Sequence, residues 1–348
     1  MRKIKLIGIT VVFIFFNMIN INTICAQKFT NPASYMEYIS LEHETISRNM
    51  WDYIKTSAHS KRMSKIEKKR KELISTTAIA KRKIERMPDY EGYSDFRDSV
   101  VSYLDLSYSM LTEDYAKIVD LEEIAEQSYD LMEAYLLAKE KANEKMDKAS
   151  LMVNNEQKKF AEKYDINLIE SEDKISKNLK KAGEVISYYN QFYLIFFKSY
   201  KQEAYLLDAL SRSDVNGIEQ NRNTLLKDSD EGLKKIVELK SYVGDISLKR
   251  SCQQVLNFYK KEASEKTPIL TDFYLKKEKF EKISVAFEAK KQSDRTKDEV
   301  DKYNNAISDY NNAINSYNKI NDELNNMRND LLEDWNKTVN NFMDKHVP

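Results

Sequence analysis

Hydrophobic residues recur at intervals of three and four along almost the whole chain beyond residue 35. That spacing places them on one side of an α-helix, because the helix completes a turn about every 3.6 residues. In the first half it predicts four helices, at about 35–59, 61–87, 94–118 and 129–164. The short connections between them favour an up-and-down antiparallel four-helix bundle.

Local signals mark several helix ends. Asn31–Ser34 supplies a turn and a capping residue ahead of the first helix, and Ser94 is suited to cap the third. Pro88–Gly92 breaks the pattern between the second and third helices. The expected apolar side of the second helix consists of Ile66, Leu73, Ile74, Ile79 and Ile84.

The second half of the sequence repeats the first. A shift of 152 residues aligns the two halves without gaps for about eighty residues. It matches Gly92 with Gly244, and a glycine suits a tight helix–helix turn that needs positive φ. The same shift matches Ile84 with Ile236, Phe96 with Leu248, Leu104 with Leu256, Ile118 with Leu270 and Asp120 with Asp272. We therefore expect a duplicated module, with a first bundle at 27–168 and a second at 169–348.

Each module closes on a related segment, Asn154–Ile166 in the first and Asn336–Val347 in the second. Here Phe160 aligns with Phe342, Lys163 with Lys345 and Tyr164 with His346, at a shift of 182 residues. The larger shift implies thirty extra residues in the last hairpin of the second module. The expected fold is all-α, with two tandem four-helix, coiled-coil-like bundles, the second carrying an elongated hairpin.

The extra residues follow a heptad pattern. Tyr303, Tyr310, Tyr317, Leu324 and Leu331 recur every seven residues, and Ile307 and Ile314 are expected to fill the alternate position of the seam. The pattern predicts a helix from about 293 to 345, roughly 80 Å long. Thr267 and Pro268 predict a break or kink in the helix before it.

Residues 188–200 form the most aromatic window of the chain beyond the N-terminal segment. The aromatic residues there surround more of the helix than one bundle face requires. Two interpretations follow. The window is a central helix that touches both bundles, or it is an exposed patch for association or an apolar ligand.

Composition supports long helices, since the chain has six glycines, four prolines and 32% charged residues. The formal net charge is zero, so the balance of charge calls for no nucleic acid partner. Residues 61–71 are strongly basic and 113–133 are acidic, which favours pairing of the second and third helices. The alternative for the basic segment is contact with an anionic surface of lipid headgroups or polysaccharide.

The N-terminus resembles a secretory signal. A basic start precedes an apolar core of eleven residues at 6–16, and cleavage after Ala26 fits the signal-peptidase pattern. Residues 1–26 are therefore expected to be removed. Cys25 raises the alternative of a lipid anchor, although Ile24 replaces the small residue that a lipobox requires. Cys252 is expected to be a small buried hydrophobe. The eleven-residue run is too short for a stable membrane span, and no run of 18 apolar residues occurs elsewhere, so no span is expected after removal of the signal.

The sequence offers no catalytic, cofactor-binding or metal-binding residues. Its three histidines, His43, His59 and His346, lack the Glu-x-x-His spacing of di-iron bundles. Nucleotide-binding, zinc-hydrolase and nucleophile-elbow motifs do not occur. The expected protein is not an enzyme and carries no cofactor.

Three segments of the first half resemble a family of uncharacterised helical surface proteins and lipoproteins of spirochaetes and Bacteroidetes-type bacteria: Tyr35–Ile46, Met87–Asp98 and Glu156–Ile166. The resemblance extends more weakly over the second half. It implies a helical envelope protein without known activity. The leading hypothesis is an exported structural or binding module in the periplasm or at the cell surface of a Gram-negative-type bacterium, with an unknown envelope protein, extracellular protein or glycan as its partner. Alternative functions are a pore-forming or membrane-perturbing protein and a ligand-sensing bundle.

Overall fold

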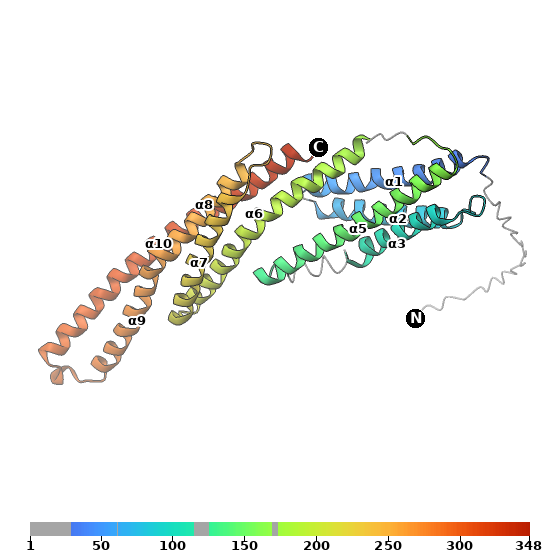
Figure 1. Cartoon of the computed structure of the whole chain (residues 1–348). Helices are drawn as coiled ribbons and strands as arrows, with labels where there is room; N and C mark the ends of the chain where they lie inside the picture. The colour runs from blue at the N-terminus through green and yellow to red at the C-terminus, as the bar shows by residue number, and fades with distance from the viewer. Residues whose placement is uncertain (1–28, 61, 115–124, 169–172) are drawn as a thin grey trace, which may run out of the picture.

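The computed structural model describes residues 29–60, 62–114, 125–168 and 173–348. Over these residues the chain is all-α, with no β-strand, as expected (Figure 1). The helices are α1 Pro32–His59, α2 Met63–Glu85, α3 Asp95–Ser109, α5 Tyr129–Lys163, α6 Lys174–Ser211, α7 Val215–Glu238, α8 Ser247–Lys261, α9 Thr267–Glu288 and α10 Lys297–His346. Three short helical segments lie between the longer helices of the described chain. They are the π-helical η1 Met110–Asp114 and η2 Glu262–Lys266, and the 3₁₀-helical η3 Gln292–Asp294.

The first bundle consists of α1, α2, α3 and α5, and each of these helices packs against the next in the chain. Its buried core draws on all four helices: Tyr35, Met36, Ile39, Ile46, Leu73, Ala80, Ile84, Met87, Phe96, Val100, Leu104, Phe160 and Ala161. The helical bundle predicted for this half is therefore confirmed.

The boundaries of α1 and the face of α2 differ from expectation. Asn31, rather than Ser34, caps α1: its side chain accepts a hydrogen bond from the Ser34 backbone, and Ser34 completes a capping box. The α3 helix begins after Ser94, as predicted, but the Ser94 side chain makes no capping hydrogen bond. Ile79 is 44% exposed because Leu73, Ala80 and Ile84 define a buried face on the opposite side of α2.

The second bundle consists of α6, α7, the α8–η2–α9 rod and α10. Its core is larger and runs from Ala182 on α6 to Val347, directly after α10. Ala125, Met132 and Tyr135 of the first half belong to the same buried cluster. The predicted break at Pro268 is a π-helical turn, η2, directly before α9, and the Thr267 hydroxyl donates to the carbonyl of Glu262 (2.9 Å). Cys252 is fully buried in this core, as predicted.

Helix α6 lies between the two bundles. It packs on α7 and α8 in its own bundle and on α1 and α5 of the first (Figure 1). Phe192, Phe196 and Phe197 are buried, whereas Tyr200 is 37% exposed. The aromatic window is thus a central helix that touches both bundles, the first of the two interpretations.

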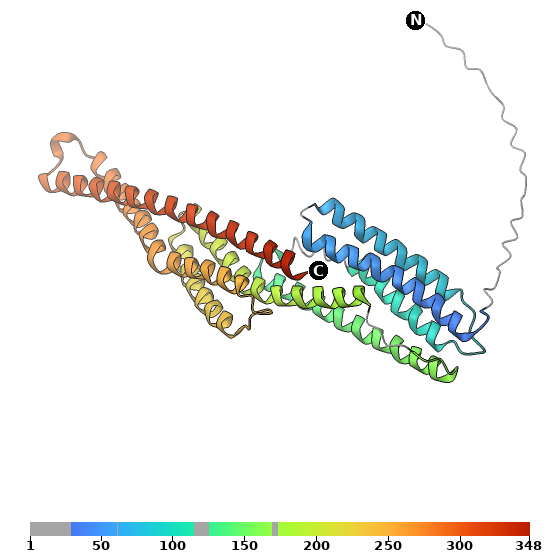
Figure 2. The same ribbon diagram turned by 90° about the horizontal axis from the view of Figure 1, so that it is seen from above.

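The arm, defined as α9 and residues 297–318 of α10, extends beyond the rest of the second bundle (Figures 1 and 2). With 50 residues, α10 is about 75 Å long. Rings of the two helices stack along the seam, with centroid distances of 4.2 Å for Phe287–Tyr303 and 5.1 Å for Phe280–Tyr310. Phe273 packs on Tyr317 in a tilted arrangement at 4.5 Å.

The seam differs from the prediction at its alternate position. Ala306 and Ala313 are buried there, while Ile307 and Ile314 are only half-buried beside it. The phenyl rings of α9 occupy the space between the helices, so small residues are needed opposite them. The Phe273, Phe280 and Phe287 heptad explains why the isoleucines do not lie in the seam.

Candidate functional site

The two helix–helix turns that contain Gly92 and Gly244 have the same backbone geometry. Gly92 and Gly244 both have φ of 79°, and the residues before them, Glu91 and Val243, have φ of 52° and 50°. Antiparallel bridges close both turns, from Tyr90 to Tyr93 and from Tyr242 to Asp245. The positive φ explains the glycine, since other residues are strained in that region.

A tyrosine from the first helix of each bundle closes each turn. The Tyr35 hydroxyl donates to the carbonyl of Pro88 (3.1 Å), and the Tyr188 hydroxyl donates to that of Lys240 (2.9 Å). Tyr35 stacks on Phe160 with a centroid distance of 5.5 Å, and Tyr188 stacks on Phe342 at 5.7 Å. The same two tyrosine contacts, with a turn carbonyl and with a phenylalanine ring, therefore occur in both bundles.

Tyr164 and His346, at the ends of the two bundles, each contact the glycine-containing turn of their own bundle, but through different groups. In the first bundle the Tyr164 hydroxyl donates to the carbonyl of Tyr90 (2.9 Å). In the second, His346 Nε2 lies 2.9 Å from Asp245 Oδ2, which Lys345 also contacts at 2.7 Å. Burial alone would raise the pKa of Asp245, but hydrogen bonds from Lys345, Ser247 and His346 hold it well below its usual range.

The two π-helical turns are separated by the same 152 residues, since η1 begins at Met110 and η2 at Glu262. A π-turn widens the helix by one residue and is frequent at functional sites. In the second bundle this turn carries Glu262, whose side chain is 1% exposed.

Glu262 belongs to a buried cluster with Glu203 of α6 and Arg328 of α10, here called the charged cluster. Arg328 Nε donates to Glu203 Oε1 (2.5 Å), and Arg328 Nη2 donates to Glu262 Oε1 (2.7 Å). The side chains of Glu203 and Arg328 are 2% and 11% exposed. Tyr259 of α8 is fully buried beside them. Thus α6, α8, η2 and α10 meet at this cluster, which lies at the base of the arm.

Two carboxyl groups share one guanidinium group in the charged cluster, so full ionisation would leave an unbalanced buried charge. Burial, followed by the proximity of Glu203, raises the pKa of Glu262 to about 9 despite the opposing effect of Arg328. Glu262 Oε2 is buried without a hydrogen-bond partner in the described structure. A neutral carboxylic acid suits that position, and its O–H can act as a donor.

The equivalent positions of the first bundle are almost entirely apolar. The shift that matches Tyr35 with Tyr188 places Met50 at the position of Glu203. The shift between the two π-turns places Met110 at the position of Glu262. The shift that matches Phe160 with Phe342 places Met146 at the position of Arg328. Ser107 takes the place of Tyr259, and its hydroxyl lies 3.9 Å from the sulfur of Met146. The charged cluster is therefore a property of the second bundle alone.

Sequence reasoning named no site residue and missed this cluster. The available signal was a charged residue within an apolar stripe: Arg328 follows Leu324 and precedes Leu331 in the heptad pattern. Since its members are almost completely buried, the cluster is suited to hold a proton rather than to bind a substrate. Within the described residues, no group of three or more His, Cys, Asp or Glu side chains could hold a metal ion.

None of the described helices combines the length and the apolar character needed to cross a bilayer. Comparison of the chain with models of protein families, with curated proteins and with solved structures finds no match. The resemblance to helical surface proteins therefore stays a prediction.

Proposed function

We propose that this protein is an exported, non-enzymatic helical module of the cell envelope or surface, with a structural or binding role in which the arm reaches a partner. The signal-like segment 1–26, which lies outside the described residues, supports export. The periplasm or the cell surface of a Gram-negative-type bacterium is the corresponding location. An envelope protein, an extracellular protein or a glycan is the corresponding class of partner.

The arm is the observation that carries this proposal. Stacked aromatic rings along its seam restrict bending, and the arm extends past the other helices of its bundle (Figure 2). Its tip is an ordered turn, because Thr296 and Glu299 form a capping box at the start of α10. The Arg295 guanidinium also lies 4.2 Å from the centroid of the Phe287 ring. Such an ordered tip is suited to hold contact residues in fixed positions.

We also propose that the chain arose by duplication of one helical module, with bundles at 27–168 and 169–348. Support comes from the shared turn geometry, the shared tyrosine contacts and the equally spaced π-turns. In this proposal the arm is the part that the second copy gained.

A shortened arm tests the role of its length. Deletion of 275–288 and 304–317 removes fourteen residues, or two heptads, from each helix and shortens the arm by about 21 Å. Phe273 and Tyr303 then meet as Phe287 and Tyr303 do now, and the tip sequence is unchanged. The hydrogen bond from Tyr274 to the carbonyl of Leu210 (2.7 Å) is also kept.

Envelope extract is passed over three immobilised proteins: the wild type, the shortened variant and a full-length variant with Lys291, Gln292 and Asp294 replaced by serine. Bound proteins are identified by mass spectrometry. We expect a set of partners that the wild type retains and both variants lose. Recovery of the same partners by all three proteins would show that the arm has no binding role.

Processing of the N-terminus tests export separately. Intact-mass analysis of the protein from a fractionated Gram-negative host should give a chain that begins at Gln27 in the periplasmic or surface fraction. A lipid-modified chain beginning at Cys25 would support the anchored alternative. An unprocessed chain in the cytoplasm would overturn the proposal of export.

A further inference from the structure

The side of α2 that faces away from the first bundle carries a row of exposed residues, here called the α2 stripe. Its members recur every three or four residues, which places them on one face: Lys68, Lys71, Ser75, Ile79, Arg82 and Arg86. All six are exposed, and they lie opposite the buried residues Leu73, Ala80 and Ile84. The stripe contains four cations and no carboxylate along about 27 Å of helix.

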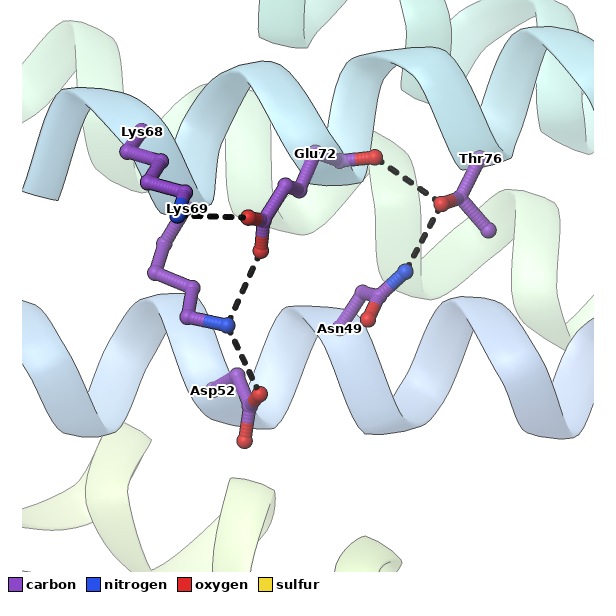
Figure 3. Close-up of polar contacts among 6 residues, drawn as sticks. All are labelled: Asn49, Asp52, Lys68, Lys69, Glu72 and Thr76. Atoms are coloured by element: carbon purple, nitrogen blue, oxygen red, sulfur yellow. Dashed lines mark hydrogen bonds and ion pairs between the residues drawn. The ribbon is translucent and has the colours of Figure 1, made fainter.

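The nearby carboxylates lie at the sides of the stripe. Figure 3 shows Lys69 between Asp52 of α1 (3.1 Å) and Glu72 of its own helix (2.9 Å). Lys68 is 3.9 Å from Glu72, and Lys71 is 3.6 Å from Glu67. These two exposed contacts are weak, since pairs at such separations in water contribute little.

At the C-terminal end of the stripe, fewer carboxylates balance the positive charge of Arg82 and Arg86. Arg82 donates a hydrogen bond to the carbonyl of Ala78, and no ion pair is formed by Arg82 or Arg86 within the described residues. The neighbouring Lys81 forms an ion pair with Asp105, and Lys83 forms one with Glu42. The positive charge of the stripe is therefore only weakly compensated, although the chain as a whole has no net charge.

We propose that the α2 stripe docks the first bundle on a membrane surface that contains anionic lipid headgroups. The exposed Ile79 favours lipid over an anionic polysaccharide. Lysine and arginine attract the headgroup phosphates, and Ile79, 44% exposed in the middle of the stripe, meets the apolar layer beneath them. An acidic polysaccharide would satisfy the cations and leave Ile79 in water.

Docking through the α2 stripe is compatible with a binding role for the arm but does not depend on that role. The stripe lies on the first bundle, whereas the tip of the arm lies at the opposite end of the molecule (Figure 1). Docking through α2 would leave the arm free of the membrane. Because the docking test uses only purified protein and lipid, it can fail while the role of the arm is upheld, and the reverse is also possible.

The test measures binding of the purified protein to vesicles by co-sedimentation. Vesicles of phosphatidylcholine containing phosphatidylglycerol are compared with phosphatidylcholine alone, at low and high salt. We expect binding to the anionic vesicles only, and weakening of that binding by salt. Replacement of all four stripe cations by glutamine should reduce the partition coefficient more than about a hundredfold, at roughly fivefold per cation.

A matched variant controls for net charge. Lys279 and Lys282 are exposed on the arm, and Lys290 and Lys291 are exposed in the turn at its tip. Replacement of these four lysines by glutamine changes the charge of the protein equally. This control should bind as the wild type does, and far-UV circular dichroism should show that both variants are folded. Equal loss of binding in the control would show that the stripe has no special role.

Two further measurements separate lipid from polyanion. Ile79→Ser should weaken vesicle binding several-fold and leave any binding to alginate, an acidic polysaccharide, unchanged. Failure of the wild type to bind anionic vesicles would overturn the proposal. Tighter binding to alginate than to vesicles, with no effect of Ile79→Ser on either, would also overturn it and favour a glycan surface.

Discussion

Replacement of Glu262 by glutamine tests whether the charged cluster holds a proton at neutral pH. Glutamine has the shape of a protonated glutamic acid but cannot ionise. The amide can still contact Arg328 through its oxygen, as Glu262 Oε1 does at 2.7 Å. The substitution therefore removes the titration of the group and changes its size very little.

The expected difference in the free energy of unfolding follows from linkage between proton binding and folding. The pKa of Glu262 rises from its ordinary 4.5 to about 9 in the folded protein. Between those values the folded state holds a proton that the unfolded state has lost, so the stability of the wild type falls as pH rises. This stabilising contribution is fully present below pH 4.5 and is lost as pH rises through 9. The limiting slope is about 1.4 kcal/mol per pH unit, or up to about 4 kcal/mol between pH 5 and pH 8.

Tryptophan fluorescence provides an assay that reports on the second bundle. The chain has two tryptophans, Trp51 on α1 and Trp335 on α10, and Trp335 is buried against Phe196 with a centroid distance of 4.8 Å. In a Trp51→Phe background, urea unfolding of Glu262→Gln and of its parent is compared from pH 5 to pH 8. The variant should match its parent near pH 5 and become progressively more stable than it at higher pH. A constant difference across the range would refute the assignment of a proton to this cluster.

The first bundle supplies a second variant for the same experiment. Glu203→Met, Glu262→Met and Arg328→Met together install the residues found at Met50, Met110 and Met146. Replacement of a whole buried ion cluster by apolar residues of similar volume is often neutral or stabilising by about 1–4 kcal/mol. Arg328→Met alone should instead cost about 3–5 kcal/mol, because it leaves two buried carboxyl groups without a cation.

Three further predictions concern the turns, the thiol and the arm. Gly92→Ala and Gly244→Ala should each destabilise the protein by about 1 kcal/mol because of their positive φ, while Gly183→Ala, in open space on a helix, should be neutral or stabilising; urea unfolding measures all three. Cys252, whose pKa is raised by burial, should react with a thiol reagent only after denaturation. Phe280→Ala should destabilise the arm by about 1–2 kcal/mol and speed amide exchange there without moving the Trp335 transition.

Much of the fold could be predicted because long helices leave a strong periodic signal. Most helix spans, the turn glycines and the burial of Cys252 follow from spacing and residue size. The third helix, predicted over 94–118, is α-helical only to Ser109 and π-helical to Asp114, and residues 115–118 lie outside the described part of the chain. Errors arose where several apolar residues competed for one face. Ile79 and Ile307 have the right chemistry for a core, but the backbone rotation that buries Ala80 and Ala306 turns them outward.

The charged cluster could not be found by the same reasoning. The chain has 56 acidic and 56 basic residues, and most of them lie on solvated faces. Only the packing of α6, η2 and α10 brings Glu203, Glu262 and Arg328 together, from positions up to 125 residues apart. The π-turn that carries Glu262 depends on backbone hydrogen bonds that no residue type specifies, since η1 in the first bundle forms the same turn from the different sequence Met110–Asp114.

The contrast between the two bundles suggests what the charged cluster contributes. The α10 helix repeats nearly the same residues every seven positions, with tyrosine at 303, 310 and 317 and alanine at 306 and 313. A slip of one heptad along α9 would therefore preserve much of the aromatic stacking in the arm. That slip would place Asn321 or Trp335 at the level of Arg328 and leave Glu203 and Glu262 buried without a cation, at a cost of several kcal/mol. A single buried polar contact can fix the register of a repetitive helix pair in this way. The helix that closes the first bundle, α5, has 35 residues rather than 50, and methionines take the place of the charged cluster there.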